Sequence, residues 1–239
     1  MNRTLQTMRY LTKSIINPTL FALVVTVIMV AITDFTFFST GQFSPSKSQS
    51  ALTIPLELTS GCFSLLIGAV IFLANFRVTL ANGISRRTFL LANLPVAMLL
   101  AAIFSIATLV LTKVHNFFWP INSLSDGIMI ENPNLNNAWP MIFQFSLYLF
   151  LILGGRFITS VYYRSNKWIR VILSLVPIMV FIFILRVVNG RQQGAFPQVI
   201  TSLITYVTQP ENIISFLVSG SLVMFALTWL VIFRAPLKD

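Results

Sequence analysis

The chain has 239 residues, of which 56% are hydrophobic and only 9% charged, and its formal net charge is +10 at pH 7. Soluble domains carry about 25% charged residues, so this composition excludes an ordinary soluble domain and indicates an integral membrane protein with several spans. The basic residues stand in short segments between apolar runs, where the enrichment of Lys and Arg in cytoplasmic loops explains them. We therefore expect no nucleic-acid partner.

The N-terminal residues 1–17 are predicted to form an amphipathic helix that lies at the membrane interface. Arg3, Arg9 and Lys13 supply its basic side, and apolar residues recur in it at helical spacing. A frayed basic tail is the alternative for so short a stripe. Pro18 is predicted to open the first span, because proline is tolerated at the start of a helix.

Six apolar stretches are long enough to cross a bilayer as helices. Gly61 and Gly68 in the second stretch are spaced for close approach of another helix. The whole chain, residues 1–239, is therefore predicted to be one all-α polytopic membrane domain of six transmembrane helices. The predicted spans are 18–38, 54–75, 88–112, 139–161, 170–188 and 212–233.

Lysine and arginine are distributed unevenly over the two sides of these predicted spans. Twelve of the 16 fall on the side that holds both termini, the hairpin after the second span and the link 162–170. Because short basic loops remain in the cytoplasm, both termini are predicted to be cytoplasmic and the protein to be a multi-pass protein of the cell membrane.

A basic hairpin, residues 76–94, joins the second and third spans. Gly83 can adopt a positive φ and so end the preceding helix. Ser85 can cap the next helix, with Thr88 at the position where a full capping box has a carboxylate. The hairpin is either an ordinary cytoplasmic loop or a docking element for a cytoplasmic partner. Its three arginines are Arg77, Arg86 and Arg87.

The chain lacks the residue patterns of an enzyme. Its one histidine stands in a predicted outer loop, and it has no HExxH, no GxSxG and no pair of carboxylates at helical spacing. It also has no GxxxxGK[ST], so it is not expected to bind ATP by a Walker loop. We expect neither a catalytic site nor a cofactor or metal in this chain.

Glu57 is the one candidate for a functional ionisable residue within the membrane, and it lies a turn or two from the outer end of the second predicted span. It is interpreted either as a pathway or gating contact, or as a carboxylate that reaches the outer interface or pairs with Arg186. Arg156, which follows two glycines in the fourth span, is expected to snorkel to the inner interface.

An uncharged amphipathic helix is predicted just before the last span, at residues 196–207. Its apolar residues recur at i, i+3, i+4 and i+7, and the run is too short to cross the membrane. It lies flat at the outer interface or is partly re-entrant, and in the second case it could line the exit of a pathway. The candidate pathway residues of this helix are Phe196, Ile200 and Leu203.

Six spans with both termini inside, a basic N-terminal helix and the hairpin ANGISRRTFLLANL resemble the membrane subunit of ABC-2-type exporters, the small bacterial half-transporter permeases. Members of that family carry a similar run at this place: an arginine after the second span, a short segment with a glycine, then Ser-Arg and the next span. The resemblance covers the whole chain in topology, and in sequence it is concentrated in residues 76–94.

The resemblance implies a short coupling helix at about 77–85, which in the family sits in a groove of a separate nucleotide-binding subunit. ATP and Mg would then be bound by that ATPase partner, and the N-terminal helix would match the family's connecting helix. Charge complementarity between a cationic hairpin and an acidic soluble surface agrees with this role. The expected docking residues are Arg77, Asn82, Gly83, Ser85, Arg86 and Arg87.

These expectations together describe the permease subunit of an ATP-driven exporter, paired with a second permease copy or a homologous permease in the lipid bilayer. The sequence offers no charged pocket, so an apolar or amphipathic substrate is expected, such as an antimicrobial peptide, a lipid or a drug. The alternative is a non-transporting membrane scaffold or a toxin-immunity protein.

Overall fold

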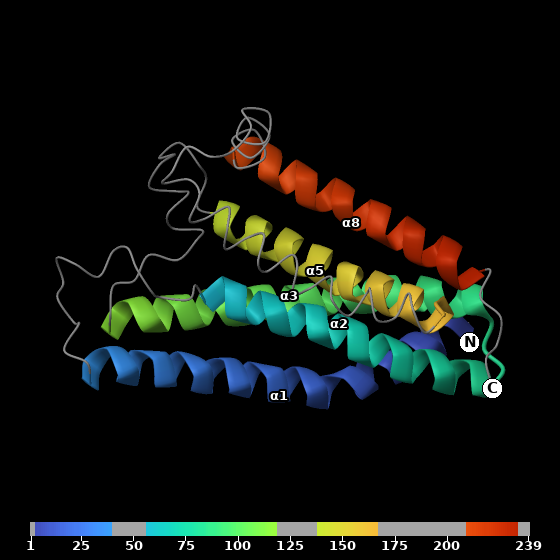
Figure 1. Cartoon of the computed structure of the whole chain (residues 1–239), viewed down its shortest axis with the longest axis horizontal. Coiled ribbons are helices and arrows are strands. Elements are labelled where there is room, and N and C mark those ends of the chain that lie inside the picture. Colours follow the sequence, from blue (N-terminus) through green and yellow to red (C-terminus); the bar gives the residue numbers. More distant parts are fainter. Residues whose placement is uncertain (1–2, 40–55, 119–137, 167–208, 234–239) are drawn as a thin grey trace.

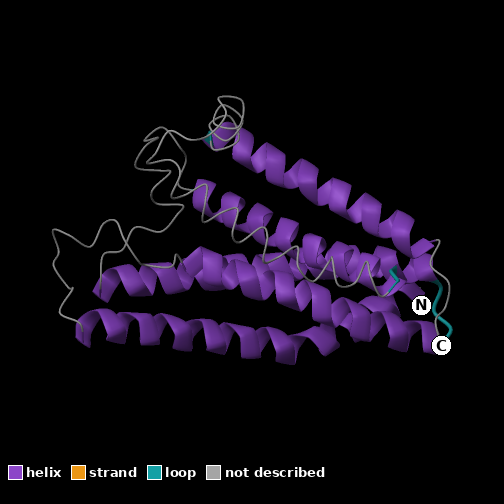
Figure 2. Ribbon diagram, in the orientation of Figure 1, coloured by secondary structure: helices purple, strands orange, loops and turns teal. Residues whose placement is uncertain are grey.

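The structure is a computed structural model, and it describes residues 3–39, 56–118, 138–166 and 209–233. All regular secondary structure in these ranges is helical (Figure 2). The helices are α1 Arg3–Ser39, α2 Leu56–Ala81, α3 Arg86–Phe118, α5 Trp139–Arg164 and α8 Pro210–Phe233.

Each of these five helices contains a stretch that is long and apolar enough to cross a membrane. Five of the six predicted spans therefore overlap with helices of the required length, although the apolar stretch of α1 is Thr4–Ile28 and not the predicted 18–38. The chain is a multi-pass helical membrane protein. The predicted fifth span, 170–188, and the predicted amphipathic helix, 196–207, lie outside the described residues.

The first helix differs from the prediction. Pro18 does not open a helix but lies inside α1, which runs without a break from Arg3 to Ser39. Leu11 and Ile15, which were expected on an interfacial helix, are buried in the core of the bundle. A proline inside a helix costs about 3 kcal/mol. Residues on both sides of Pro18, such as Ile15 and Ala22, belong to the buried core, and α1 packs on α2 and α3. This packing offsets the cost, so no separate interfacial helix forms.

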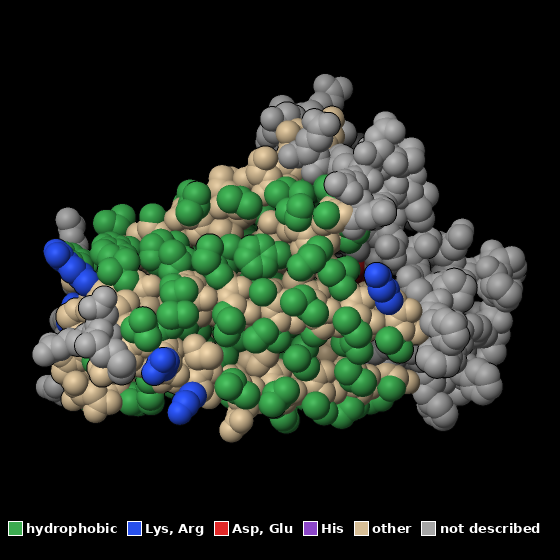
Figure 3. Space-filling view, turned by 180° about the vertical axis from the view of Figure 1, so that it is seen from behind, with side chains coloured by type: hydrophobic (Ala, Val, Ile, Leu, Met, Phe, Trp, Pro, Cys, Tyr) green, Lys and Arg blue, Asp and Glu red, His purple; other side chains and the backbone are tan. Residues whose placement is uncertain are grey.

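The helices form an elongated bundle in which α1 and α3 run one way and α2, α5 and α8 run the other (Figure 1). The start of α1, the turn between α2 and α3, and the ends of α5 and α8 therefore lie at the same end, which we call the arginine end. Its described arginines include Arg77, Arg86, Arg87 and Arg164. In the space-filling view most of the visible basic side chains lie toward this end and one lies toward the opposite end, where Lys113 stands near the end of α3, whereas apolar side chains cover most of the remaining described surface (Figure 3).

The centre of the bundle is a close contact between α2 and α5, which share the most extensive interface among the described helices. A Cβ at Gly155 would overlap the carbonyl oxygen of Leu65, and a Cβ at Gly68 would overlap the carbonyl oxygen of Ile152. The prediction of a close approach at Gly68 is thus confirmed. Gly61 is also tight, because a Cβ there would lie 3.0 Å from the side chain of Leu151.

Candidate functional site

The turn between α2 and α3 has the backbone geometry of a helix C-terminus closed by glycine. Gly83 has φ of 72°. Its N–H donates to the carbonyl of Leu80 at 3.0 Å, and the N–H of Ile84 donates to the carbonyl of Thr79 at 3.1 Å. These two bonds form a Schellman motif, which satisfies carbonyl groups that the end of a helix leaves without partners. The prediction that Gly83 adopts a positive φ and ends the preceding helix is confirmed.

The start of α3 is capped as predicted. The Ser85 hydroxyl accepts the backbone N–H of Thr88 at 3.2 Å, and the two side-chain oxygens are 2.8 Å apart. Thr88 thus contacts the side chain of the capping serine, whereas the carboxylate of a full capping box would accept the backbone N–H of that serine. Local hydrogen bonds thus close both of the helix ends that flank the α2–α3 turn.

The structure has no separate coupling helix at 77–85, which corrects the expectation from the resemblance. Arg77 lies in the continuous helix α2, which ends only at Ala81. Phe76 explains this continuity, because its ring packs on two aromatic rings of other helices. The ring centre of Phe76 lies 5.4 Å from that of Phe89 on α3 and 5.6 Å from that of Tyr163 on α5. Its burial holds the last turns of α2 in the bundle, so the helix does not break before Gly83.

The three arginines of the hairpin have different surroundings. Arg77 is exposed, as is the neighbouring Asn82. Arg86 donates to the carbonyls of Ile232 and Phe233 at the end of α8, at 3.3 and 3.5 Å. The guanidinium of Arg87 lies 5.2 Å from the centre of the Phe233 ring. Sequence reasoning missed both contacts with α8, because that helix follows almost 150 residues later and no local signal links the two segments.

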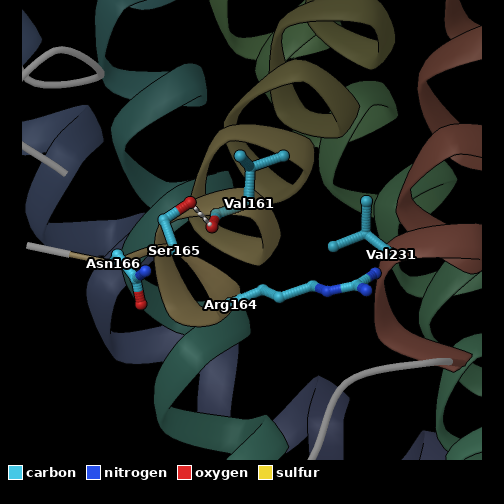
Figure 4. A pocket seen from close by; sticks show the side chains of 5 residues that line it. All are labelled: Val161, Arg164, Ser165, Asn166 and Val231. Carbon is cyan, nitrogen blue, oxygen red and sulfur yellow. Dashed lines mark hydrogen bonds between the residues drawn. The ribbon is translucent and has the colours of Figure 1, made fainter. Parts of the chain in front are cut away.

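A pocket lies next to these contacts, between the last turns of α5 and α8. It has a volume of about 290 Å³, and Arg164 reaches across it from α5 toward α8 (Figure 4). Sequence reasoning did not single out this pocket, since its walls come from two helices far apart in the chain. Its lining residues are Val161, Arg164, Ser165, Asn166 and Val231.

The second candidate site lies toward the opposite end of the helices and is centred on Glu57. This residue is only 1% exposed, and its carboxylate accepts the side-chain N–H of Gln144 at 3.4 Å. Such burial does not fit a carboxylate at the membrane interface, one of the interpretations made from the sequence. Arg186, the other predicted partner, lies outside the described residues, and so do Phe196, Ile200 and Leu203.

Three buried hydroxyl groups from three different helices meet beside Glu57. The Tyr148 hydroxyl lies 2.9 Å from Thr108 Oγ1 and 3.2 Å from Ser60 Oγ, and the last two oxygens are 3.3 Å apart. We call these residues, with Glu57 and Gln144, the Glu57 cluster. The cluster connects α2, α3 and α5, and the buried side-chain oxygen of Gln144 has no hydrogen-bond partner among the described residues.

Arg156 is a buried cation on α5, in the half of the helix nearer the arginine end. Contrary to the expectation, its side chain does not snorkel to the interface. It is 3% exposed, and its guanidinium donates to the carbonyl of Asn93 at 2.8 Å. The close approach of α5 at Gly155 places the next residue against neighbouring helices, so the path to the interface is blocked by packing. Arg156 thereby connects α5 to α3.

No protein-family model, no curated protein and no solved structure matches this chain. The five helices long and apolar enough to cross a membrane define the class of the protein as a multi-pass helical membrane protein. Within the described residues, no three or more His, Cys, Asp or Glu side chains are grouped so that they could hold a metal ion.

Proposed function

We propose that this chain is the membrane-spanning permease subunit of an ABC-2-type exporter, and that its α2–α3 turn docks on a separate ATPase. The observation that carries the proposal is a turn closed on both sides by local hydrogen bonds, with exposed Asn82 in the turn and exposed Arg77 on the last turns of α2 before it. Exposed cations on a structure of defined shape can match an acidic surface in charge and in register.

The packing of α2 supports a role in passing on movement of the ATPase. Phe76 joins the turn to the body of α2, α3 and α5 through its aromatic contacts. Farther along α2, the close backbone contact at Gly68 joins it to α5, and Ser60 joins it to the Glu57 cluster. A displacement of the turn would therefore move α2 relative to its neighbours rather than deform a flexible loop.

The remaining parts of the function follow from this proposal. ATP and Mg are bound by the partner ATPase, and the transported molecule is apolar or amphipathic, such as an antimicrobial peptide, a lipid or a drug. A second permease, identical or homologous, completes the pathway. Glu57 is the described residue best placed to act in gating, because it is buried where three helices meet.

The proposal requires the arginine end to be cytoplasmic, as the enrichment of Lys and Arg in cytoplasmic loops predicts. Single cysteines at Ser85 and Ala138, in a Cys62→Ser background, would report on the two ends of the bundle. An impermeant thiol reagent should label the Ala138→Cys protein in whole cells and the Ser85→Cys protein only after permeabilisation. The reverse pattern would contradict the orientation.

Arg77→Glu tests the docking. Truncating one side of an interface ion pair costs about 2–5 kcal/mol when the remaining charge is buried, so ATPase binding should weaken about thirtyfold or more. Arg77 is the informative position, because Arg86 also contacts α8 and its replacement would disturb the bundle. The measurement is the amount of ATPase that copurifies with the tagged chain from native membranes, together with its response to substrate.

The matched control is Arg9→Glu, which makes the same charge change at another exposed arginine, on α1. It should leave copurification within about twofold of wild type, as expected for a charge at the rim of an interface or outside it. If both variants retain the ATPase equally, the docking role of the turn is wrong. Copurification of the wild-type chain without any ATPase would favour the alternative, a scaffold or toxin-immunity protein.

A further inference from the structure

The end of α8 is surrounded by three arginines from two other helices. Arg86 donates to its last carbonyls, Arg87 lies against the Phe233 ring, and Arg164 lines the pocket beside Val231. We call these three residues the α8 arginine cluster. The helix-end carbonyls carry only about half a negative charge and are already engaged by Arg86. The side chain of Arg164 makes no hydrogen bond or ion pair with any other described residue.

No described carboxylate balances this cluster. The described ranges contain three acidic residues, Asp34, Glu57 and Glu211, and each stands near the opposite end of its helix. Glu211, for instance, is separated from Phe233 by about 33 Å along α8, taking 1.5 Å per residue. That distance is several times the screening length at physiological salt, so a carboxylate at that end of the bundle does not neutralise Arg164.

The pocket that Arg164 lines has the chemistry of a site for an anionic headgroup. Val161 and Val231 form apolar walls, and Asn166 adds an amide group that can donate hydrogen bonds. The volume of about 290 Å³ is close to the lower limit for small-molecule sites, about 300 Å³. The guanidinium of Arg164 can donate two parallel N–H bonds to one phosphate group.

The pocket also lies beside a surface suited to acyl chains. Leu227 is one turn before Val231 on the same face of α8, and it is exposed, as is Leu230. Both helices that form the pocket are apolar enough to span a membrane. Phosphate-binding groups at the end of an apolar span, next to exposed leucines, match the two parts of a phospholipid better than they match a soluble acidic protein.

We propose that the pocket between α5 and α8 binds the phosphate headgroup of an anionic phospholipid, with Arg164 as its main ligand and the acyl chains along α8. This site is separate from the proposed docking surface at Arg77 and does not depend on an ATPase partner. A lipid held there would contact both α5 and α8 and stabilise their packing at the arginine end.

The test uses the full chain, purified and placed in nanodiscs of phosphatidylcholine with or without phosphatidylglycerol. Native mass spectrometry of the released protein would count the bound phosphatidylglycerol, and its titration would give the affinity. Wild type should retain phosphatidylglycerol in preference to phosphatidylcholine. Arg164→Gln should bind it about tenfold more weakly, the loss expected for one charge-assisted contact. Arg9→Gln, an equal charge change on α1, should bind like wild type.

Two further arms make the outcome decisive. Val231→Phe keeps all three arginines but fills the pocket, and it should also lose phosphatidylglycerol, which covers the case that Arg164→Gln fails to fold. Inorganic phosphate and glycerol 3-phosphate should compete only weakly, since they lack acyl chains. Equal affinity for these soluble phosphates would overturn the lipid as the source. If Arg164→Gln and Val231→Phe both bind as much phosphatidylglycerol as wild type, the proposed site is wrong. If Arg9→Gln loses as much phosphatidylglycerol as Arg164→Gln, the binding is nonspecific attraction by charge and the site is wrong as well. Binding of an acidic protein but not of phosphatidylglycerol would also overturn it.

Discussion

The helix α2 takes part in two regions that are built on different principles. Along its length it packs against α5, where Gly68 and Gly155 bring the two backbones together and the Glu57 cluster is buried. At its end it enters the α2–α3 turn, where Gly83 and Ser85 close the helix ends through local hydrogen bonds. The first region depends on residues distant in the chain, whereas the second depends on residues within a few positions of one another.

The difference shows where this protein can present charge. In the α2–α5 region, polar groups are buried and hydrogen-bonded to neighbouring helices, so a change there alters the packing of the whole bundle. Near the turn, Arg77 is exposed on the last turns of α2, so its charge is available to a partner. Substitutions should therefore affect stability in the first region and partner binding in the second.

The largest effect is expected at Gly155, and its neighbour Gly154 is the matched control. Gly155→Val would place side-chain atoms against the backbone of Leu65, and we expect the free energy of unfolding to fall by about 3 kcal/mol, the upper end of the usual range for overpacking. A Cβ at Gly154 would meet nothing within 4 Å, so Gly154→Val should change stability by less than about 0.5 kcal/mol. Thermal unfolding of the purified protein in detergent measures both changes. If the two variants lose the same stability, α2 and α5 do not approach each other closely at Gly155.

A smaller effect is expected in the turn, at Gly83. With φ of 72°, an alanine at this position is strained, and Gly83→Ala should lower the free energy of unfolding by about 1 kcal/mol. Gly83→Asn should cost less, because asparagine tolerates this conformation better. The same thermal measurement applies. Asn82→Ala, at the exposed neighbouring residue, should leave stability unchanged. If Asn82→Ala lowers the free energy of unfolding as much as Gly83→Ala does, the positive φ at Gly83 is not the cause of the loss.

The smallest effect is expected from Tyr148→Phe in the Glu57 cluster. The change removes the hydroxyl that bonds to Ser60 and Thr108 but keeps the buried ring. Hydrogen bonds between membrane helices average about 0.6 kcal/mol, so the loss of stability should be of that size. Tyr10→Phe, at an exposed tyrosine of α1, should have no effect. If the two variants unfold at the same temperature, the hydroxyl contacts contribute nothing to packing, and the contrast between the two regions would rest on Gly155 alone.

The sequence by itself determined the features that depend on local order. Long apolar runs predicted a membrane span in each of the five described helices, because a span needs about 20 apolar residues and no distant contact. The closure of α2 at Gly83 and the cap at Ser85 were predicted for the same reason, since the residues that form those hydrogen bonds lie within five positions of one another.

Only the tertiary structure decided the features that depend on which helices are neighbours. Helix α1 continues through Pro18 because its buried residues pack on α2 and α3, which outweighs the local preference of proline. Arg156 is buried rather than snorkelling, because the close approach of α5 to α2 surrounds it with other helices. The contacts of Arg86 and Arg164 at the end of α8 join residues far apart in the chain. Helical periodicity can give the face of a residue, but only packing gives the helix that this face meets.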